Sequence, residues 1–199
     1  MTTLLVFDIR LHMPIQVEAA CEAIEKAWKL TQRIRGLCPS TNNPQSLVGQ
    51  MGYRSGGWYR ERSIDFIVRL PRPMTLDDAQ NLNLMGTFVN TSFIITMAAI
   101  LEGYEFTPYG DSVNKSKECW EFALLTKWLR NYFVHGEFKR TPTAEDIKKA
   151  KKTRELLMKL LPIVKDADHD FPTSIDTILE PLKDKLQSYI RAFSEPVSP

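Results

Sequence analysis

Apolar residues recur with helical spacing along most of the chain, which predicts a mainly α-helical protein. The segment 15–35, for example, keeps its apolar residues near one stripe and is followed by Gly36, a residue type that commonly ends helices. Hydroxyl residues followed by carboxylates indicate where later helices begin. The pattern predicts a bundle of about five helices, at residues 15–35, 75–102, 111–133, 143–162 and 173–193.

Two regions instead alternate apolar and polar residues in the manner of β-strands. Residues 4–12 alternate in this way, and two more strands are predicted within residues 47–70, on either side of a Ser-Gly-Gly turn. We therefore expect a small antiparallel β-ribbon formed from residues 4–12 and 47–70. The loop and ribbon at residues 37–70 would be an insertion in a single helical domain, residues 1–199.

The stretch 79–101 contains no charged residue and is long enough for a membrane span. Amide and hydroxyl side chains are spread along it and make it too polar for lipid: Gln80, Asn81, Asn83, Asn90, Thr91 and Ser92. We expect a buried central helix here and no membrane contact. The start of the chain also lacks the basic region of a signal peptide, so the predicted location is the cytoplasm.

Length, charge and cysteine content constrain the function only loosely. The 199 residues suit one domain with a real core, and 26 basic against 24 acidic residues give a formal charge of +2. Nucleic-acid binding would therefore depend on local clusters of positive charge. Cys21, Cys38 and Cys119 lack metal-ligand spacing, which favours buried thiols in a reducing compartment and predicts no metal or other cofactor.

The candidate chemistry is concentrated in one run, RNYFVHG at residues 130–136, near the predicted end of a helix. The guanidinium of Arg130 stays protonated and binds phosphate oxygens, whereas the imidazole of His135 exchanges a proton near neutral pH. On an ideal α-helix the two side chains would lie about 140° apart around the axis. They could act on one atom only if the last turn loosens or two chains cooperate. Alternatively, both side chains serve only the helix end, by bonding its last carbonyls.

This motif, Arg130-Asn131 followed by His135-Gly136 in a helical chain of this size, resembles the signature of the HEPN superfamily. That signature is Arg, then four to six residues, then His, and here the spacing is four. The resemblance covers roughly residues 75–165. It implies a HEPN-like helical bundle and a homodimer in which two motifs face each other across one cleft. It also implies a metal-independent endoribonuclease, acting in a toxin–antitoxin or antiviral defence setting.

The resemblance assigns roles to three residues. Arg130 would stabilise charge on the phosphoryl oxygens, His135 would transfer a proton, and Asn131 would orient the His or a substrate oxygen. In the branch of the family that pairs with a nucleotidyltransferase antitoxin, a Tyr stands where this chain has Glu137. We expect no antitoxin of that class, while another antitoxin or defence-system partner stays open. The alternative function is a non-catalytic helical interaction module in which the motif is structural.

Small residues on one face of the predicted third helix suggest where two chains would meet. Cys119, Ala123 and Thr126 lead up to Arg130 at spacings of four, three and four. Such side chains would let a second helix approach closely, so we expect the dimer contact on this face.

Two further regions contain residue types suited to binding RNA. A basic segment follows the motif, and a loop interleaves aromatic with basic residues, which are patterns for phosphate binding and base stacking. The candidates are Lys148, Lys149, Lys151 and Lys152 in the segment, and Tyr53, Trp58 and Arg60 in the loop. Each region also has a plainer interpretation: a solvated helix face for the lysines, and a loop anchored to the core for the aromatic residues.

Overall fold

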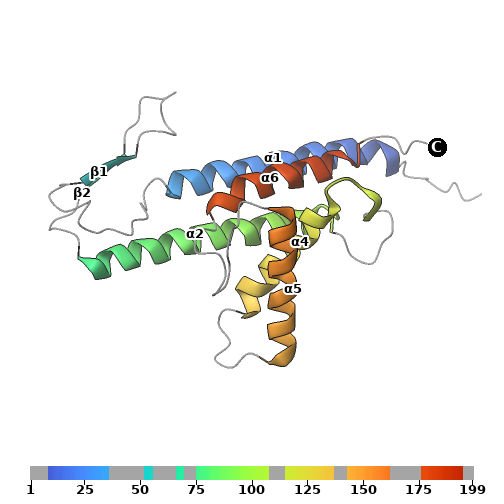
Figure 1. Cartoon of the computed structure of the whole chain (residues 1–199). Coiled ribbons are helices and arrows are strands. Elements are labelled where there is room, and N and C mark those ends of the chain that lie inside the picture. Colours follow the sequence, from blue (N-terminus) through green and yellow to red (C-terminus); the bar gives the residue numbers. More distant parts are fainter. Residues whose placement is uncertain are drawn as a thin grey trace, which may run out of the picture. The chain divides into compact units, whose positions relative to one another are not determined.

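The computed structural model describes residues 9–35, 52–55, 66–69, 75–107, 115–136, 143–161 and 176–194 (Figure 1). These residues contain five α-helices, one π-helical turn and two short strands. In chain order they are α1 (Ile9–Arg35), β1 (Gly52–Ser55), β2 (Phe66–Arg69), α2 (Leu76–Gly103), α4 (Trp120–Asn131), η3 (Tyr132–Gly136), α5 (Ala144–Leu160) and α6 (Asp176–Arg191). The chain divides into a first unit, Met1–Lys26 with Ile94–Pro199, and a second unit, Ala27–Phe93.

Capping boxes begin two of these helices at the predicted residues. At the start of α2, the Asp78 amide donates to Thr75 Oγ1 at 3.2 Å, and the Thr75 amide donates to Asp78 Oδ2 at 2.9 Å. Thr143 and Asp146 make the same reciprocal pair at the start of α5. Each cap satisfies amides that have no partner inside the helix and contributes about 1 kcal/mol. The predicted starts of α2 and α5 are confirmed.

The first unit is a helical bundle, as predicted. It is formed by α1 up to Lys26, α2 from Ile94, and the whole of α4, α5 and α6, and α4 contacts both α5 and α6. α1 and α6 lie side by side (Figure 1), and between them Gln187 Nε2 donates to the Cys21 carbonyl at 3.3 Å. Because Gln187 is buried, this bond satisfies a group that would otherwise lose its water at a cost.

The core of the first unit combines aliphatic residues with an aromatic cluster. Tyr189 is fully buried, and its hydroxyl donates to the Phe106 carbonyl at 2.9 Å. The Phe193 ring packs edge-on against the Phe106 ring, with 5.0 Å between the ring centroids. Burial raises the pKa of Tyr189 well above its usual range. Fully buried leucines from α4, α5 and α6 complete the core: Leu125, Leu129, Leu157, Leu182 and Leu186.

In the second unit, the end of α1 packs against the first part of α2. The Trp28 and Phe93 rings lie 5.2 Å apart between centroids, and both side chains are buried. Arg35 Nη1 donates to Asn90 Oδ1 at 2.5 Å, which gives the buried amide of Asn90 a charged partner. This polar residue of α2 therefore serves packing within the chain.

The strands differ from the prediction at the N-terminus. β1 and β2 pair antiparallel, with Gly52 opposite Arg69. Residues 9–12, predicted to form a strand, are instead the beginning of α1, so that prediction is wrong there. The remainder of the predicted N-terminal strand lies outside the described residues. A short alternating run does not separate strand from helix, because Ile9 and Met13 are also four positions apart, as on one helix face.

The helix predicted at residues 111–133 is interrupted before its middle. Cys119 has a left-handed backbone with φ 60°, and α4 begins only at Trp120. The turn before α4 is held to the residues that follow α6. Lys117 Nζ donates to the Ala192 carbonyl at 2.9 Å and lies 5.3 Å from the centre of the Phe193 ring. These tertiary contacts offset the cost of about 1–2 kcal/mol for a left-handed non-glycine residue.

α2 is buried along only part of its length, which corrects the prediction of a buried central helix. Its later residues Ile94, Met97 and Leu101 are buried, but Leu84 and Phe88 are 66% and 71% exposed. Among the described residues, α2 is the one helix long and apolar enough to cross a membrane, and 44% of its most apolar window is buried.

Candidate active site at the end of α4

Arg130 lies in the last turn of a helix that is anchored by its apolar face. Phe122, Leu125 and Leu129 of α4 are buried, and Phe133 continues that face into η3. The side chain of Arg130 lies beside this face and is 33% exposed. An anion from solution can therefore reach the guanidinium, while the surrounding protein limits its screening by water.

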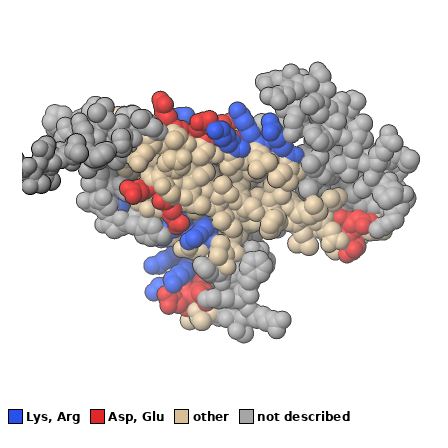
Figure 2. All heavy atoms as spheres, turned by 180° about the vertical axis from the view of Figure 1, so that it is seen from behind, with Lys and Arg blue, Asp and Glu red and all other residues tan. Residues whose placement is uncertain are grey.

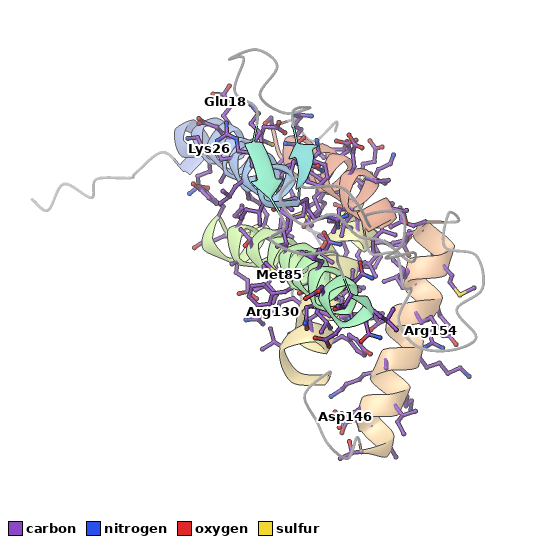
Figure 3. All side chains as sticks on the ribbon, turned by 90° about the vertical axis from the view of Figure 1, so that its left-hand side faces the viewer. Glu18, Lys26, Met85, Arg130, Asp146 and Arg154 are labelled. Carbon is purple, nitrogen blue, oxygen red and sulfur yellow. The ribbon has the colours of Figure 1, made fainter. Side chains whose placement is uncertain are left out.

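Two polar side chains hold the guanidinium of Arg130, which is labelled in Figure 3. Its Nη1 atom lies 3.7 Å from Oε1 of Glu102, at the end of α2, and donates to Asn131 Oδ1 at 3.2 Å. Both contacts use the same nitrogen of a group that has five N–H donors. The guanidinium is thus oriented from one side, and Asn131 contacts Arg130 itself.

The backbone that follows Arg130 widens into the π-helical turn η3. A π-helix is closed by i→i+5 hydrogen bonds, so five residues come closer to one full turn than in an α-helix. This wider turn reduces the angle around the helix axis between positions 130 and 135. A smaller angle is what the two side chains need in order to act on one atom. The backbone of His135 lies in η3. Its side chain lies outside the described part of the structure.

The aromatic residues at this helix end support the wide turn. Phe133 is 4% exposed, and the Tyr132 ring meets it edge-on with 5.5 Å between centroids. Val134, by contrast, is 39% exposed. The turn is therefore fixed to the core at its second residue and turns outward immediately afterwards.

The basic helix α5 lies next to the motif, because it contacts both α4 and η3. Lys159 near its end pairs with Glu121 of α4 at 2.8 Å. The four lysines predicted to bind phosphates, Lys148, Lys149, Lys151 and Lys152, are all exposed. Lys149 also pairs with Glu145 at 2.7 Å, a contact that raises the pKa of the lysine. Figure 2 shows basic side chains gathered in this region, with acidic side chains next to them.

The other predicted residues lie in the second unit or outside the described residues. Tyr53 belongs to β1 in the second unit, and its side chain is not described. Trp58, Arg60 and Glu137 lie outside the described residues. The exposure of the four lysines is compatible with phosphate binding, and the role predicted for the aromatic loop stays a prediction.

The small-residue face of the third predicted helix is occupied inside the chain. Ala123 and Thr126 are both fully buried, and Thr126 Oγ1 donates to the Phe122 carbonyl at 2.8 Å. Cys119 precedes α4 with a left-handed backbone and so does not continue its face. A second helix cannot pack on these side chains without unfolding the first unit, so the expected dimer contact on this face is wrong.

Glu102 was not predicted from the sequence to be the partner of Arg130. The signal was nevertheless present, since Glu102 is the first charged residue after the uncharged stretch 79–101. A carboxylate near the C-terminus of a helix is unfavourable for the helix dipole unless a cation pairs with it. Its contact with Arg130 supplies one, and only the fold shows that the ends of α2 and α4 meet.

Within the described residues, no group of three or more His, Cys, Asp or Glu side chains could hold a metal ion. Cys21 and Cys119 are free thiols, and burial raises the pKa of each. A raised pKa reduces the thiolate fraction at neutral pH, which makes both thiols poor nucleophiles.

No protein-family model matches the chain, and neither a curated protein nor a solved structure shows significant similarity.

Proposed function

We propose that this chain is a metal-independent endoribonuclease of the HEPN type. The observation that carries the proposal is the position of Arg130. Its guanidinium is partly exposed and is oriented by Glu102 and Asn131, in the last turn of α4 before the π-helical turn that contains His135. The proposed setting is a cytoplasmic toxin–antitoxin or antiviral system. The proposed active form is a homodimer with a composite site.

The proposed reaction needs a proton-transfer group and a fixed positive charge. The 2′-hydroxyl of one nucleotide loses its proton and attacks the adjacent phosphorus, and the bond to the 5′-oxygen of the next nucleotide breaks. The leaving 5′-oxygen takes up a proton, and the products are a 2′,3′-cyclic phosphate and a 5′-hydroxyl. His135 would transfer these protons, and Arg130 would stabilise the charge on the phosphoryl oxygens, an effect that can reach about 3–4 kcal/mol.

The neighbouring helix supports the choice of a nucleic-acid substrate. α5 contacts η3, and its exposed lysines lie on a helix beside the motif. Positive charge on this helix would hold phosphates that flank the one that reacts. The overall charge of +2 gives no such preference, so the local arrangement matters.

A non-catalytic interaction module is the second candidate, and one observation favours it. The guanidinium of Arg130 already has a carboxylate and an amide partner within the chain. An Arg that links the ends of α2 and α4 in this way would stabilise the fold without any substrate. The two candidates differ in what the loss of Arg130 changes, namely catalysis or stability.

The deciding experiment measures cleavage and stability of the same variants. Arg130→Ala and His135→Ala should abolish cleavage of single-stranded RNA, with melting temperatures near that of the parent. Lys127→Ala, which removes a cation one turn earlier on α4, is the matched control and should still cleave. Cleavage by the parent should survive chelators and leave cyclic phosphate ends. An inactive parent together with an unstable Arg130→Ala variant would instead establish the structural role.

A further inference from the structure

The first half of α5, residues 144–152, is exposed to solvent on all sides. None of these residues is buried, and the first buried side chain of α5 is that of Thr153. This segment is nevertheless helical, because the capping box fixes its first turn. Figure 3 labels Asp146 within the segment and Arg154 just after it. The first half of α5 is therefore a surface element and not part of the core.

Three lysines of this segment have no acidic partner in the part of the chain that the structure describes. Their side chains fall within about 100° of arc around the helix, on the side opposite the buried Leu157. They span about 6 Å along the axis, and the exposed Glu155 ends the group one turn later. We call these three residues the lysine patch: Lys148, Lys151 and Lys152.

The residue types of α5 indicate which form of RNA the lysine patch fits. The helix contains no aromatic residue. Sites for single strands combine positive charge with aromatic side chains on which free bases stack. Paired RNA is instead bound mainly by shape, through its phosphates and 2′-hydroxyls. Lysines on an exposed helix without aromatic neighbours can make contacts of this second kind only, so the patch fits a paired stem.

The lysine patch lies near the end of α4 but not beside the guanidinium of Arg130. Lys159, near the end of α5, pairs with Glu121, near the start of α4, and α5 also contacts η3. The two helices are therefore antiparallel, with the earlier part of α5 toward η3. Glu121 and Arg130 are nine positions apart, which places them on opposite sides of α4. The patch is thus separated from Arg130 by about one helix diameter, roughly 10 Å, and contacts another part of the RNA.

The chemistry of cleavage requires the part of the RNA at Arg130 to be unpaired. The attacking 2′-oxygen, the phosphorus and the leaving 5′-oxygen must lie nearly in line. The regular backbone of a paired stem does not allow this alignment, whereas an unpaired nucleotide can rotate into it. A stem can therefore be bound by the chain but not cut.

We propose that the substrate is an RNA in which a paired stem adjoins the unpaired segment that is cut, and that the lysine patch holds the stem through its phosphates. This proposal rests on the proposed function, because it names the class of RNA that the Arg130 site receives. The stem fixes the position of the adjoining strand, so that a defined unpaired nucleotide reaches Arg130.

The binding test compares a hairpin RNA with an open strand of the same loop sequence. Both carry 2′-fluoro groups on the unpaired nucleotides, which prevents cleavage. The parent should bind the hairpin more tightly, and replacing Lys148, Lys151 and Lys152 together with Gln should remove this preference. If each lysine neutralises one phosphate, a fourfold rise in salt should weaken hairpin binding by the parent roughly 20- to 40-fold more than binding by the variant.

A control variant removes the same number of charges from other exposed positions of the first unit. It replaces Lys26, Lys115 and Lys185 with Gln and should keep the preference for the hairpin. Circular dichroism establishes that both triple variants are folded. With unmodified RNA, the parent should cut the hairpin at unpaired nucleotides next to the stem. Loss of the lysine patch should lower kcat/KM for the hairpin to the value for the open strand.

Three results would overturn the proposal. The first is equal binding of the hairpin and the open strand by the parent, and the second is an equal loss in the control variant. The third is hairpin binding that does not change when the lysine patch is lost, since α5 would then be a surface for an acidic protein. A parent that binds the hairpin through the patch but cuts neither RNA would support the stem site and refute the ribonuclease function.

Discussion

Replacing Glu102 with Gln should strengthen RNA binding if Arg130 receives a phosphate. In the free protein the carboxylate of Glu102 lies 3.7 Å from Arg130 Nη1 and partly neutralises it. A phosphate that approaches the guanidinium must weaken this pair and is also repelled by the carboxylate. The amide of Gln keeps the size of the side chain and removes both effects.

The geometry limits the size of the change. Two unit charges at this distance attract each other by about 1 kcal/mol in bulk water and by about 4 kcal/mol at an effective dielectric constant of 20. The two side chains are 33% and 37% exposed, so solvent screens much of the attraction. Pairs of this kind typically contribute about 0.2–1 kcal/mol. We expect the dissociation constant for RNA to fall by a factor of about 1.4 to 5.

The assay is fluorescence anisotropy with single-stranded RNA that carries 2′-fluoro groups, which lack the attacking hydroxyl and so prevent cleavage. Glu118→Gln is the matched control, since it removes the same charge near the opposite end of α4. Residues 120 and 130 alone are about 15 Å apart along that helix, beyond the Debye length of about 10 Å at 0.1 M salt. The gain for Glu102→Gln should shrink as the salt concentration rises.

Weaker or unchanged binding by Glu102→Gln at low salt would refute this reasoning. It would mean that the carboxylate orients Arg130 for packing and does not compete with a phosphate. An equal gain for Glu118→Gln would also refute it, because the change would then reflect total charge and not the Arg130 site. A loss of stability without any change in binding would favour the interaction module.

Three further predictions test other parts of the molecule. Replacing the exposed lysines of α5 with Gln (Lys148, Lys149, Lys151 and Lys152) should raise KM, flatten the salt dependence of RNA binding and leave kcat nearly unchanged; a fall in kcat alone would contradict a binding role. Because its pKa is raised, the phenol of Tyr189 stays neutral in the folded state, whereas an unfolded tyrosine ionises near pH 10. The contribution of Tyr189 to stability is therefore present below about pH 10 and is lost as the pH rises above it. Tyr189→Phe should therefore flatten the alkaline loss of stability in urea unfolding, and Tyr104→Phe, which changes a partly exposed tyrosine, should not. Thr143→Ala should lower the free energy of unfolding by about 1 kcal/mol, measured by the same method, because it removes the capping box of α5; no change would show that the cap is redundant.

Local signals predicted most of the helical framework. Thr75 and Thr143 begin helices because their hydroxyls accept hydrogen bonds from amides three residues later, a rule that needs no knowledge of the rest of the fold. The end of α1 at Arg35 was also correct, since a glycine follows. Features that depend only on neighbouring residues can be derived from the sequence.

Features set by distant contacts could not be derived in that way. The left-handed turn at Cys119 is held by the hydrogen bond from Lys117 to the carbonyl of Ala192, a residue that is far away in sequence. A rule about a single residue also failed at the start of α1, which includes Pro14, a residue that normally marks a helix boundary. At the candidate site, the motif itself suggested Arg130, but its ion pair with Glu102 depends on how α2 and α4 pack.

The π-helical turn η3 changes what the spacing between Arg130 and His135 means. In a regular α-helix, one inserted residue would rotate the histidine by about 100° and remove it from the site. At a helix end that can widen, an extra residue can instead be absorbed by a change in the type of turn, and the face on which the histidine lies is preserved. The direction in which position 135 faces is then set by the type of turn that follows α4 as well as by the number of residues after Arg130.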